Sequence, residues 1–171
     1  KGEYVTTKGA ATALNIAQVN ILPQISLIEK EETVLGREYV RQNLATDLAS
    51  RHFRNQLALL YESYPKFTEL AEQSWNGLRI RSFDGRNGRQ GSNDKLSLLI
   101  QDGNFVSEIG WMGSGLQMWL QIMWFLSRVN EDEIVILDEP DVYMHPDLQR
   151  KLIRLLRNRY KYVIVSTHSI E

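Results

Sequence analysis

Residues 133–140 read Glu-Ile-Val-Ile-Leu-Asp-Glu-Pro, a β-branched apolar run that ends in two adjacent carboxylates. Residues 162–169 read Tyr-Val-Ile-Val-Ser-Thr-His-Ser, again an apolar run with a polar end. Continuous apolar runs of this kind are typical of parallel strands that are covered on both faces. Between them, residues 146–160 begin with proline and carry leucines on one helical face. The sequence therefore predicts a strand, a helix and a parallel strand, which makes the chain an α/β protein.

The remaining sequence predicts helices and a small antiparallel sheet. Residues 38–62 contain neither Pro nor Gly and place apolar side chains at helical spacing, so we expect one long amphipathic helix that Pro65 ends. A shorter helix is expected at 67–75, and strands are expected at 19–22, 78–83, 95–101 and 104–109. Asp102-Gly103 would form a two-residue hairpin turn, and residues 84–93 would form an exposed loop.

The composition is that of one ordinary domain. The 171 residues are 43% hydrophobic, and 20 Lys and Arg balance 21 Asp and Glu. The net charge of -1 excludes a global attraction to nucleic acid or to an anionic membrane. The absence of cysteine excludes disulfides and thiolate chemistry and fits a reducing cytoplasm.

The most apolar stretch, 116–126, is too short to span a membrane. The abrupt ends of the sequence lead us to expect a longer natural chain.

Asp138 and Glu139 stand where an α/β sheet places its ligands, at the end of a strand. Neighbouring side chains of a strand point in opposite directions, so one carboxylate can hold hydrated Mg²⁺ while the other orients or deprotonates a water. The alternative is a strand that simply ends in an acidic turn. His168 follows Asp138 by 30 residues, at the end of the adjacent parallel strand. Its imidazole could bond a phosphate and hold a water in line, or it could be a core or capping histidine.

The start of the apolar helix offers a third element. Gly113, Ser114 and Gly115 would present free backbone N–H groups, a hydroxyl and the positive end of the helix dipole to an anion. An ordinary capped helix is the alternative.

These elements, in this order, resemble the motifs of ATP-binding-cassette ATPases. Asp138 matches the magnesium residue of the Walker B motif, Glu139 the catalytic glutamate and His168 the switch histidine. Residues 113–117 are similar to the signature motif, usually Leu-Ser-Gly-Gly-Gln: Ser114, Gly115 and Gln117 match, while Gly113 and Leu116 depart from it. Gln24 occupies the place of the Q-loop glutamine, with Gln18 as a rival.

The resemblance implies a P-loop NTPase fold, with parallel core strands, a helical signature subdomain and a small antiparallel hairpin. It implies ATP and Mg²⁺ as cofactors, and a dimer in which the signature of one subunit closes over the γ-phosphate held by its partner. No Gly-x-x-x-x-Gly-Lys-[Ser/Thr] loop occurs in the sequence, so we expect an incomplete domain whose Walker A loop lies outside this chain.

The segment after the acidic strand indicates which branch of the class is involved. His145-Pro146 and Gln149 resemble soluble chromosome-maintenance, repair and OLD-type nuclease ATPases rather than transporters. We therefore expect a cytoplasmic ATPase that powers a DNA-repair or phage-defence effector, with a nuclease and DNA as possible partners and no membrane. An ATP-gated clamp with little hydrolysis and a transporter's nucleotide-binding subunit stay open as alternatives. Two sets of basic residues could contact nucleic acid or form solvated faces: positions 79, 81, 86, 89 and 95 around the loop, and positions 150, 154, 157 and 161 on one face of the last helix.

The domain organisation follows from these motifs. We expect residues 1–171 to be one ATPase domain segment. Within it, 1–35 hold the Q-loop region, 36–76 the helical region, 77–130 the hairpin and signature helix, and 131–171 the Walker B, D-loop and switch-histidine βαβ unit.

Overall fold

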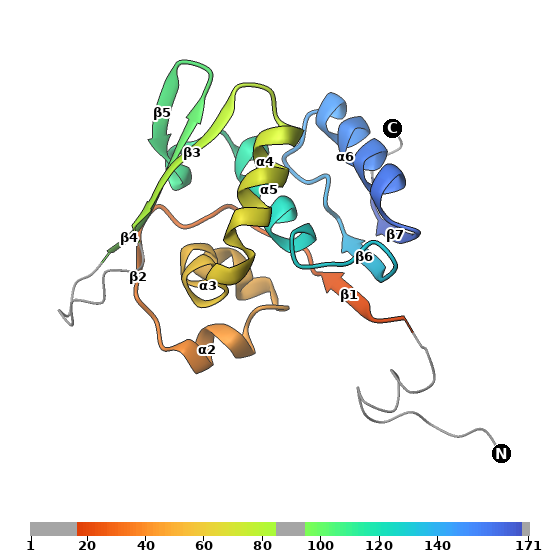
Figure 1. Cartoon of the computed structure of the whole chain (residues 1–171), viewed down its shortest axis with the longest axis horizontal. Coiled ribbons are helices and arrows are strands. Elements are labelled where there is room, and N and C mark those ends of the chain that lie inside the picture. Colours follow the sequence, from red (N-terminus) through yellow and green to blue (C-terminus); the bar gives the residue numbers. More distant parts are fainter. Residues whose placement is uncertain (1–16, 85–94, 169–171) are drawn as a thin grey trace.

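The computed structural model describes residues 17–84 and 95–168, and a three-stranded parallel sheet lies at one side of the molecule (Figure 1). The strands are β1 (Val19–Leu22), β6 (Ile134–Asp138) and β7 (Tyr162–Ser166), in the order β1-β6-β7. Helix α6 (Pro146–Arg159) connects β6 to β7, which pair in parallel from Ile134↔Tyr162 to Asp138↔Ser166. The predicted strand, helix and parallel strand are confirmed, and with them the α/β class.

One face of this sheet is packed and the other is exposed. Leu22, Val135 and Leu137 are buried in one core with helix α5 (Ser114–Leu126) and with the leucines of α6. The opposite face shows Val19, Ile21, Tyr162 and Ile164, which are 47–57% exposed. The expectation that these strands are covered on both faces is therefore wrong for the described residues, because all the described helices that contact the sheet pack on one side.

The antiparallel sheet is built around β4 (Lys95–Asp102). Strand β3 (Leu78–Asp84) pairs along one edge of β4, while β2 (Glu32–Thr33) and β5 (Phe105–Glu108) share the other edge. Asp102 pairs with Phe105, so the hairpin turn is Gly103-Asn104, one residue later than predicted. Gly103 supplies the positive φ of 59° that this turn needs. The predicted exposed loop lies, except for Asp84, outside the described residues.

The predicted long helix over 38–62 is wrong, because the chain forms α2 (Arg37–Gln42), a 3-10 helix (Asp47–His52), α3 (Phe53–Leu59) and a second 3-10 turn (Tyr61–Ser63). After α2, the Thr46 hydroxyl accepts the Leu48 N–H and starts a new segment. Buried Glu32 accepts the backbone N–H groups of Arg54 and Asn55, so a carboxylate from a distant strand caps the start of α3. Such a cap cannot be read from helical spacing.

Helix α4 (Tyr64–Ser74) packs against α5 in the middle of the molecule (Figure 1). Pro65 lies in the first turn of α4 rather than breaking a helix, since the first turn does not need its N–H. Phe67 packs edge-to-face on Trp124 at 5.7 Å, and the Trp119 indole donates to the Ser74 hydroxyl at 2.9 Å. All residues from Leu116 to Leu126 are buried, which fixes the position of the glycines at the start of α5.

Candidate active site

Three segments that are distant in sequence meet at the carboxyl edge of the parallel sheet. Gln24 follows β1 by one proline, Glu139 follows β6 directly, and His168 comes two residues after β7. Carboxyl ends of parallel strands share one edge, so the sheet topology alone brings these residues together. Backbone pairing continues past β6, where the Glu139 N–H donates to the Ser166 carbonyl at 2.9 Å.

The Glu139 carboxylate is held from both sides. Gln24 Nε2 donates to Glu139 Oε2 at 2.7 Å, and His168 Nε2 lies 3.0 Å from Glu139 Oε1. Glu139 has a φ of 46°, in the left-handed region that a residue with a Cβ rarely adopts. Its side chain is 25% exposed, while that of His168 is 93% exposed. A half-buried carboxylate between an amide and an imidazole can orient a water and take its proton.

Asp138 ends β6 and points away from this cluster. It pairs in register with Ser166 and, by strand alternation, shares the exposed sheet face with Ile134 and Ile136. Among residues 17–84 and 95–168, no group of three or more Asp, Glu or His side chains could hold a metal ion. A single exposed strand-end carboxylate nevertheless suits Mg²⁺, which takes one or two protein carboxylates and completes its shell with phosphate oxygens and water.

The predicted signature residues lie at the start of α5. Gly113 is the N-cap residue, its carbonyl accepts the N–H groups of Leu116 and Gln117, and it has no side chain with which to cap the first turn. Gly113 and Ser114 are exposed. A Cβ on Gly115 would lie 3.2 Å from a Leu148 methyl and 3.6 Å from the Tyr143 carbonyl oxygen, so glycine lets the segment after β6 pack closely here. The exposed amides and dipole at this helix start can accept an anion.

Gln117 differs from its neighbours because it is only 4% exposed. Its carboxamide bonds backbone groups of two other segments, Ile28 and Met112. Contact with nucleotide by Gln117 stays a prediction, and the structure buries its side chain between neighbouring segments.

Gln24 and Gln18 lie at opposite ends of β1. Gln18 precedes β1, at the opposite end of the strand from Glu139, and bonds the Asn20 side chain at 3.0 Å.

The segment between β6 and α6 is ordered by its own contacts. His145 accepts the Asp147 N–H at 3.3 Å through Nδ1 and so caps α6, with Pro146 in the first turn. Arg150 donates to Asp147 at 2.7 Å and lowers the pKa of that carboxyl. In this structure the His145-Pro146 pair therefore defines a helix start. The predicted basic positions 150, 154 and 157 are exposed on α6, whereas 86 and 89 lie outside the described residues.

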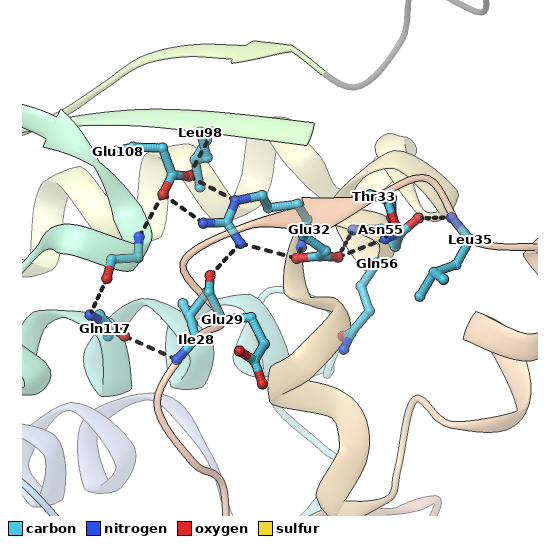
Figure 2. A network of polar contacts seen from close by, with 12 residues as sticks. Ile28, Glu29, Glu32, Thr33, Leu35, Asn55, Gln56, Leu98, Glu108 and Gln117 are labelled. Atoms are coloured by element: carbon cyan, nitrogen blue, oxygen red, sulfur yellow. Dashed lines mark hydrogen bonds and ion pairs between the residues drawn. The ribbon is translucent and has the colours of Figure 1, made fainter. Parts of the chain in front are cut away.

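The spacing patterns miss a buried polar network between α3, β2 and β5. Fully buried Arg54 binds Glu32 at 3.1 Å and Glu108 at 2.6 Å. Figure 2 shows both carboxylates in this network together with Asn55 and Gln117. Burial by itself would lower the pKa of Arg54, but hydrogen bonds and attraction from Glu108 and Glu32 outweigh it, and the net shift is upward. No spacing pattern in the sequence points to this network, because Arg54 stands beside polar Asn55 and Gln56.

Comparison with known families places the chain in a class. Residues 17–171 match the family described as "AAA domain, putative AbiEii toxin, Type IV TA system". The chain therefore belongs to this family of AAA domains. Family and fold together identify the domain as an ATP-binding-cassette class P-loop ATPase. This is the nucleotide-binding type of ATPase domain that the motifs predicted. No curated protein matches the sequence.

Solved structures similar to the chain include Smc heads. An SmcHead bound to the C-winged helix domain of ScpA has 13% identity and a TM-score of 0.53, over 95% of this chain and 52% of that one. A Pyrococcus yayanosii Smc head with a coiled coil and joint has 16% identity and a TM-score of 0.47, over 74% and 25%. A Pyrococcus furiosus Smc head bound to the C-terminal domain of ScpA has 13% and 0.47, over 77% and 37%. The chain thus spans about a quarter to a half of these structures, and the likeness concerns the fold.

None of the helices in residues 17–84 and 95–168 combines the length and the apolar character needed to cross a bilayer.

Proposed function

We propose that this chain contributes the signature-to-switch part of an ATPase that binds ATP between two subunits and hydrolyses it. The observation that carries the proposal is the contact of Glu139 with both Gln24 and His168 at the carboxyl edge of the sheet. Three residue types suited to positioning and deprotonating a water meet there from three separate strands. An acidic turn at a strand end would not require such convergence.

Each residue has a role in this proposal. Glu139 takes the proton of the attacking water, Gln24 orients the Glu139 carboxylate, and exposed His168 can turn from Glu139 to the γ-phosphate. Asp138 would hold Mg²⁺, which neutralises charge on the phosphates when bound. Gly113, Ser114 and Gly115 would receive the γ-phosphate held by the partner subunit, through the amides and dipole at the start of α5.

We further propose that the phosphate-binding loop comes from a segment that is not contained in this chain. The sequence lacks a Gly-x-x-x-x-Gly-Lys-[Ser/Thr] loop. The sheet face that carries Asp138 also exposes apolar side chains, including Val19, Ile21 and Ile164. A further segment packed on that face would bury these side chains and lie next to Asp138. The similar SmcHead structure, of which this chain covers 52%, is long enough to hold such a segment.

Two features support a proposal for the effector: the residues that follow β6 and the description of the matched family. His145-Pro146 resembles chromosome-maintenance, repair and OLD-type nuclease ATPases, and the matched family description names a toxin of a toxin–antitoxin system. A cytoplasmic DNA-repair or phage-defence effector, including a nuclease, suits both. Exposed arginines on α6 supply the charge for a contact with DNA.

The test is Glu139→Gln in the full-length protein. Replacing the carboxylate by an amide keeps the shape and removes the base, so steady-state phosphate release should fall by about 100-fold or more. ATP-dependent dimerisation, followed by light scattering, should be retained or strengthened. Glu131→Gln is the control, because Glu131 is exposed in the turn before β6. Turnover of Glu139→Gln within a few-fold of the wild type would refute the role of Glu139.

The same measurements separate the alternative of an ATP-gated clamp. A clamp would dimerise with ATP while the wild-type protein releases phosphate at the background rate. The departures from the signature pattern at Gly113 and Leu116 are the observation that keeps this alternative open.

A further inference from the structure

The segment from Gln24 to Thr33, called the Gln24 segment below, has few backbone partners of its own. Only Glu32 and Thr33 form a strand, and Ile25, Ile28 and Glu32 are buried. Backbone N–H and C=O groups at buried positions require partners. Side chains of α3, α5 and the 3-10 helix before α3 supply them, which makes the position of this segment depend on specific polar residues.

Gln117 provides the most direct of these contacts. Its Oε1 accepts the Ile28 N–H at 3.0 Å, and its Nε2 donates to the Met112 carbonyl at 2.7 Å. Met112 precedes Gly113, so one side chain connects the Gln24 segment with the loop that leads into the candidate signature residues. Figure 2 shows the contact of Gln117 with Ile28. Only a side chain with an acceptor and a donor at this separation can make both bonds.

Two further contacts connect the same parts. Gln121 lies one turn after Gln117 on α5 and donates to the Ser26 carbonyl at 2.9 Å. Arg54 donates to the Glu29 carbonyl at 3.0 Å and to both carboxylate oxygens of Glu108, of which Oε2 also accepts the Gly110 N–H at 2.8 Å. The two backbones also touch directly, since a Cβ on Gly110 would lie 2.8 Å from the Glu29 carbonyl oxygen.

We propose that Gln117 is a positioning residue that couples Gln24, and through it Glu139, to the Gly113–Ser114 start of α5. The proposal rests on the function proposed above and gives Gln117 a role other than nucleotide contact. Gln24 contacts Glu139 in the catalytic site of its own subunit, whereas Ser114 would face the phosphate held by the partner. Gln117 would hold both residues in one rigid unit. Binding of the partner's phosphate at Ser114 would then change the position of Gln24 and, with it, the way Glu139 orients the water.

The experiment is a double-mutant cycle on ATP turnover in the full-length protein. Gln117→Met keeps the length of the side chain and removes both hydrogen bonds, and it should lower kcat by about 10- to 100-fold, because small displacements at a reacting centre cost that much. The KM for ATP should change little. In a Gln24→Ala background, Gln117→Met should add much less than in the wild type, since its effect passes through Gln24.

Controls distinguish the other roles that Gln117 could have. Gln73→Met removes an exposed glutamine that bonds Glu69 on α4, and it should leave turnover unchanged. Gln121→Leu removes the Ser26 contact, together with longer bonds to the Gln117 carbonyl at 3.4 Å and the Met118 sulfur at 3.9 Å, and leaves both Gln117 side-chain bonds in place. It is used if circular dichroism shows that Gln117→Met does not fold. It should lower kcat in the same direction and by less.

The outcomes separate this inference from the proposed function. Independent, multiplicative effects of the Gln24 and Gln117 substitutions would overturn the positioning role while leaving the ATPase intact. A raised KM with unchanged kcat would also overturn it, because that result indicates direct nucleotide contact. A wild-type protein without turnover would overturn the proposed function, and the positioning role with it.

Discussion

Replacement of Arg54 by methionine should destabilise the protein more than any exposed charge replacement. The Arg54 side chain is 0% exposed, and its guanidinium binds Glu32, whose side chain is 3% exposed, and Glu108, whose side chain is 19% exposed. Methionine fills most of the space but leaves a buried carboxylate without its cation. Removing one partner of a buried ion pair typically costs about 3–5 kcal/mol. Against a total stability of about 5–15 kcal/mol, this loss is a large fraction.

The assay is equilibrium unfolding in urea, followed by tryptophan fluorescence. Buried Trp119 and Trp124 report on the α5 core. With a urea dependence of about 2 kcal/mol/M, a loss of about 4 kcal/mol lowers the midpoint by roughly 2 M. Arg79→Met is the matched control, because Arg79 is exposed and lies 3.6 Å from Glu72. Surface pairs of that kind contribute about 0–1 kcal/mol.

A second replacement identifies the cause of the loss. If the unpaired Glu32 carboxylate is responsible, adding Glu32→Gln to Arg54→Met should restore part of the stability, because the amide is neutral and its oxygen still accepts one of the two backbone N–H groups at positions 54 and 55. The net upward pKa shift of Arg54 keeps it charged throughout the usable pH range, so the loss should not depend on arginine titration. A loss below about 1 kcal/mol for Arg54→Met, with an unchanged urea slope, would refute this reasoning.

Three further predictions concern other parts of the molecule. His168→Ala in the full-length protein should reduce phosphate release by about 100-fold while ATP still binds, and near-normal turnover would contradict its proposed role. Gly110→Ala should cost about 1–3 kcal/mol in urea unfolding, because its Cβ would lie 2.8 Å from a backbone oxygen, whereas Gly36→Ala meets nothing within 4 Å and should be neutral. Burial lowers the pKa of His52 from 6.5, so the folded state binds its proton less readily than the unfolded state. Stability should therefore fall as the pH drops below about 6.5, and the His52→Gln variant should lack that part of the pH dependence.

The parallel core and its edge could be predicted because short-range patterns fix them. The apolar runs at β6 and β7, with a leucine-bearing helix between them, allow one simple topology, a parallel pair. Once the strands are parallel, Glu139 and His168 must lie at the same edge. The sequence could not establish that Gln24 rather than Gln18 reaches Glu139. That distinction depends on the direction of β1, which only its pairing with β6 defines.

The helical region could not be predicted because tertiary contacts override its spacing. Apolar residues from Val40 to Leu60 recur as in one helix. The first helix nevertheless ends at Gln42, and the 3-10 helix that follows ends at His52, which is a second break directly before α3. The second break depends on Glu32, more than 20 residues earlier, which binds the amides at the start of α3. Local propensity carries no information about such a partner. The same reason explains why Arg54 could be predicted neither as a buried residue nor as part of a network.

The burial of polar side chains in α3 and α5 follows from the irregular backbone that these helices cover. The Ser26 N–H bonds the Ser50 hydroxyl, the Ile28 N–H bonds Gln117 and the Leu35 N–H bonds Asn55. An apolar core would leave each of these groups unpaired, at about 1–3 kcal/mol apiece. A regular strand would satisfy them without side chains, but it would continue the direction of β1 and carry the backbone away from α5. The polar residues therefore stabilise a segment that leaves the parallel sheet at Gln24 and reaches the antiparallel sheet at Glu32. Because these contacts go to the backbone, an exposed side chain of the Gln24 segment such as Leu27 can change without loss of its path, whereas Gln117, Asn55 and Arg54 cannot.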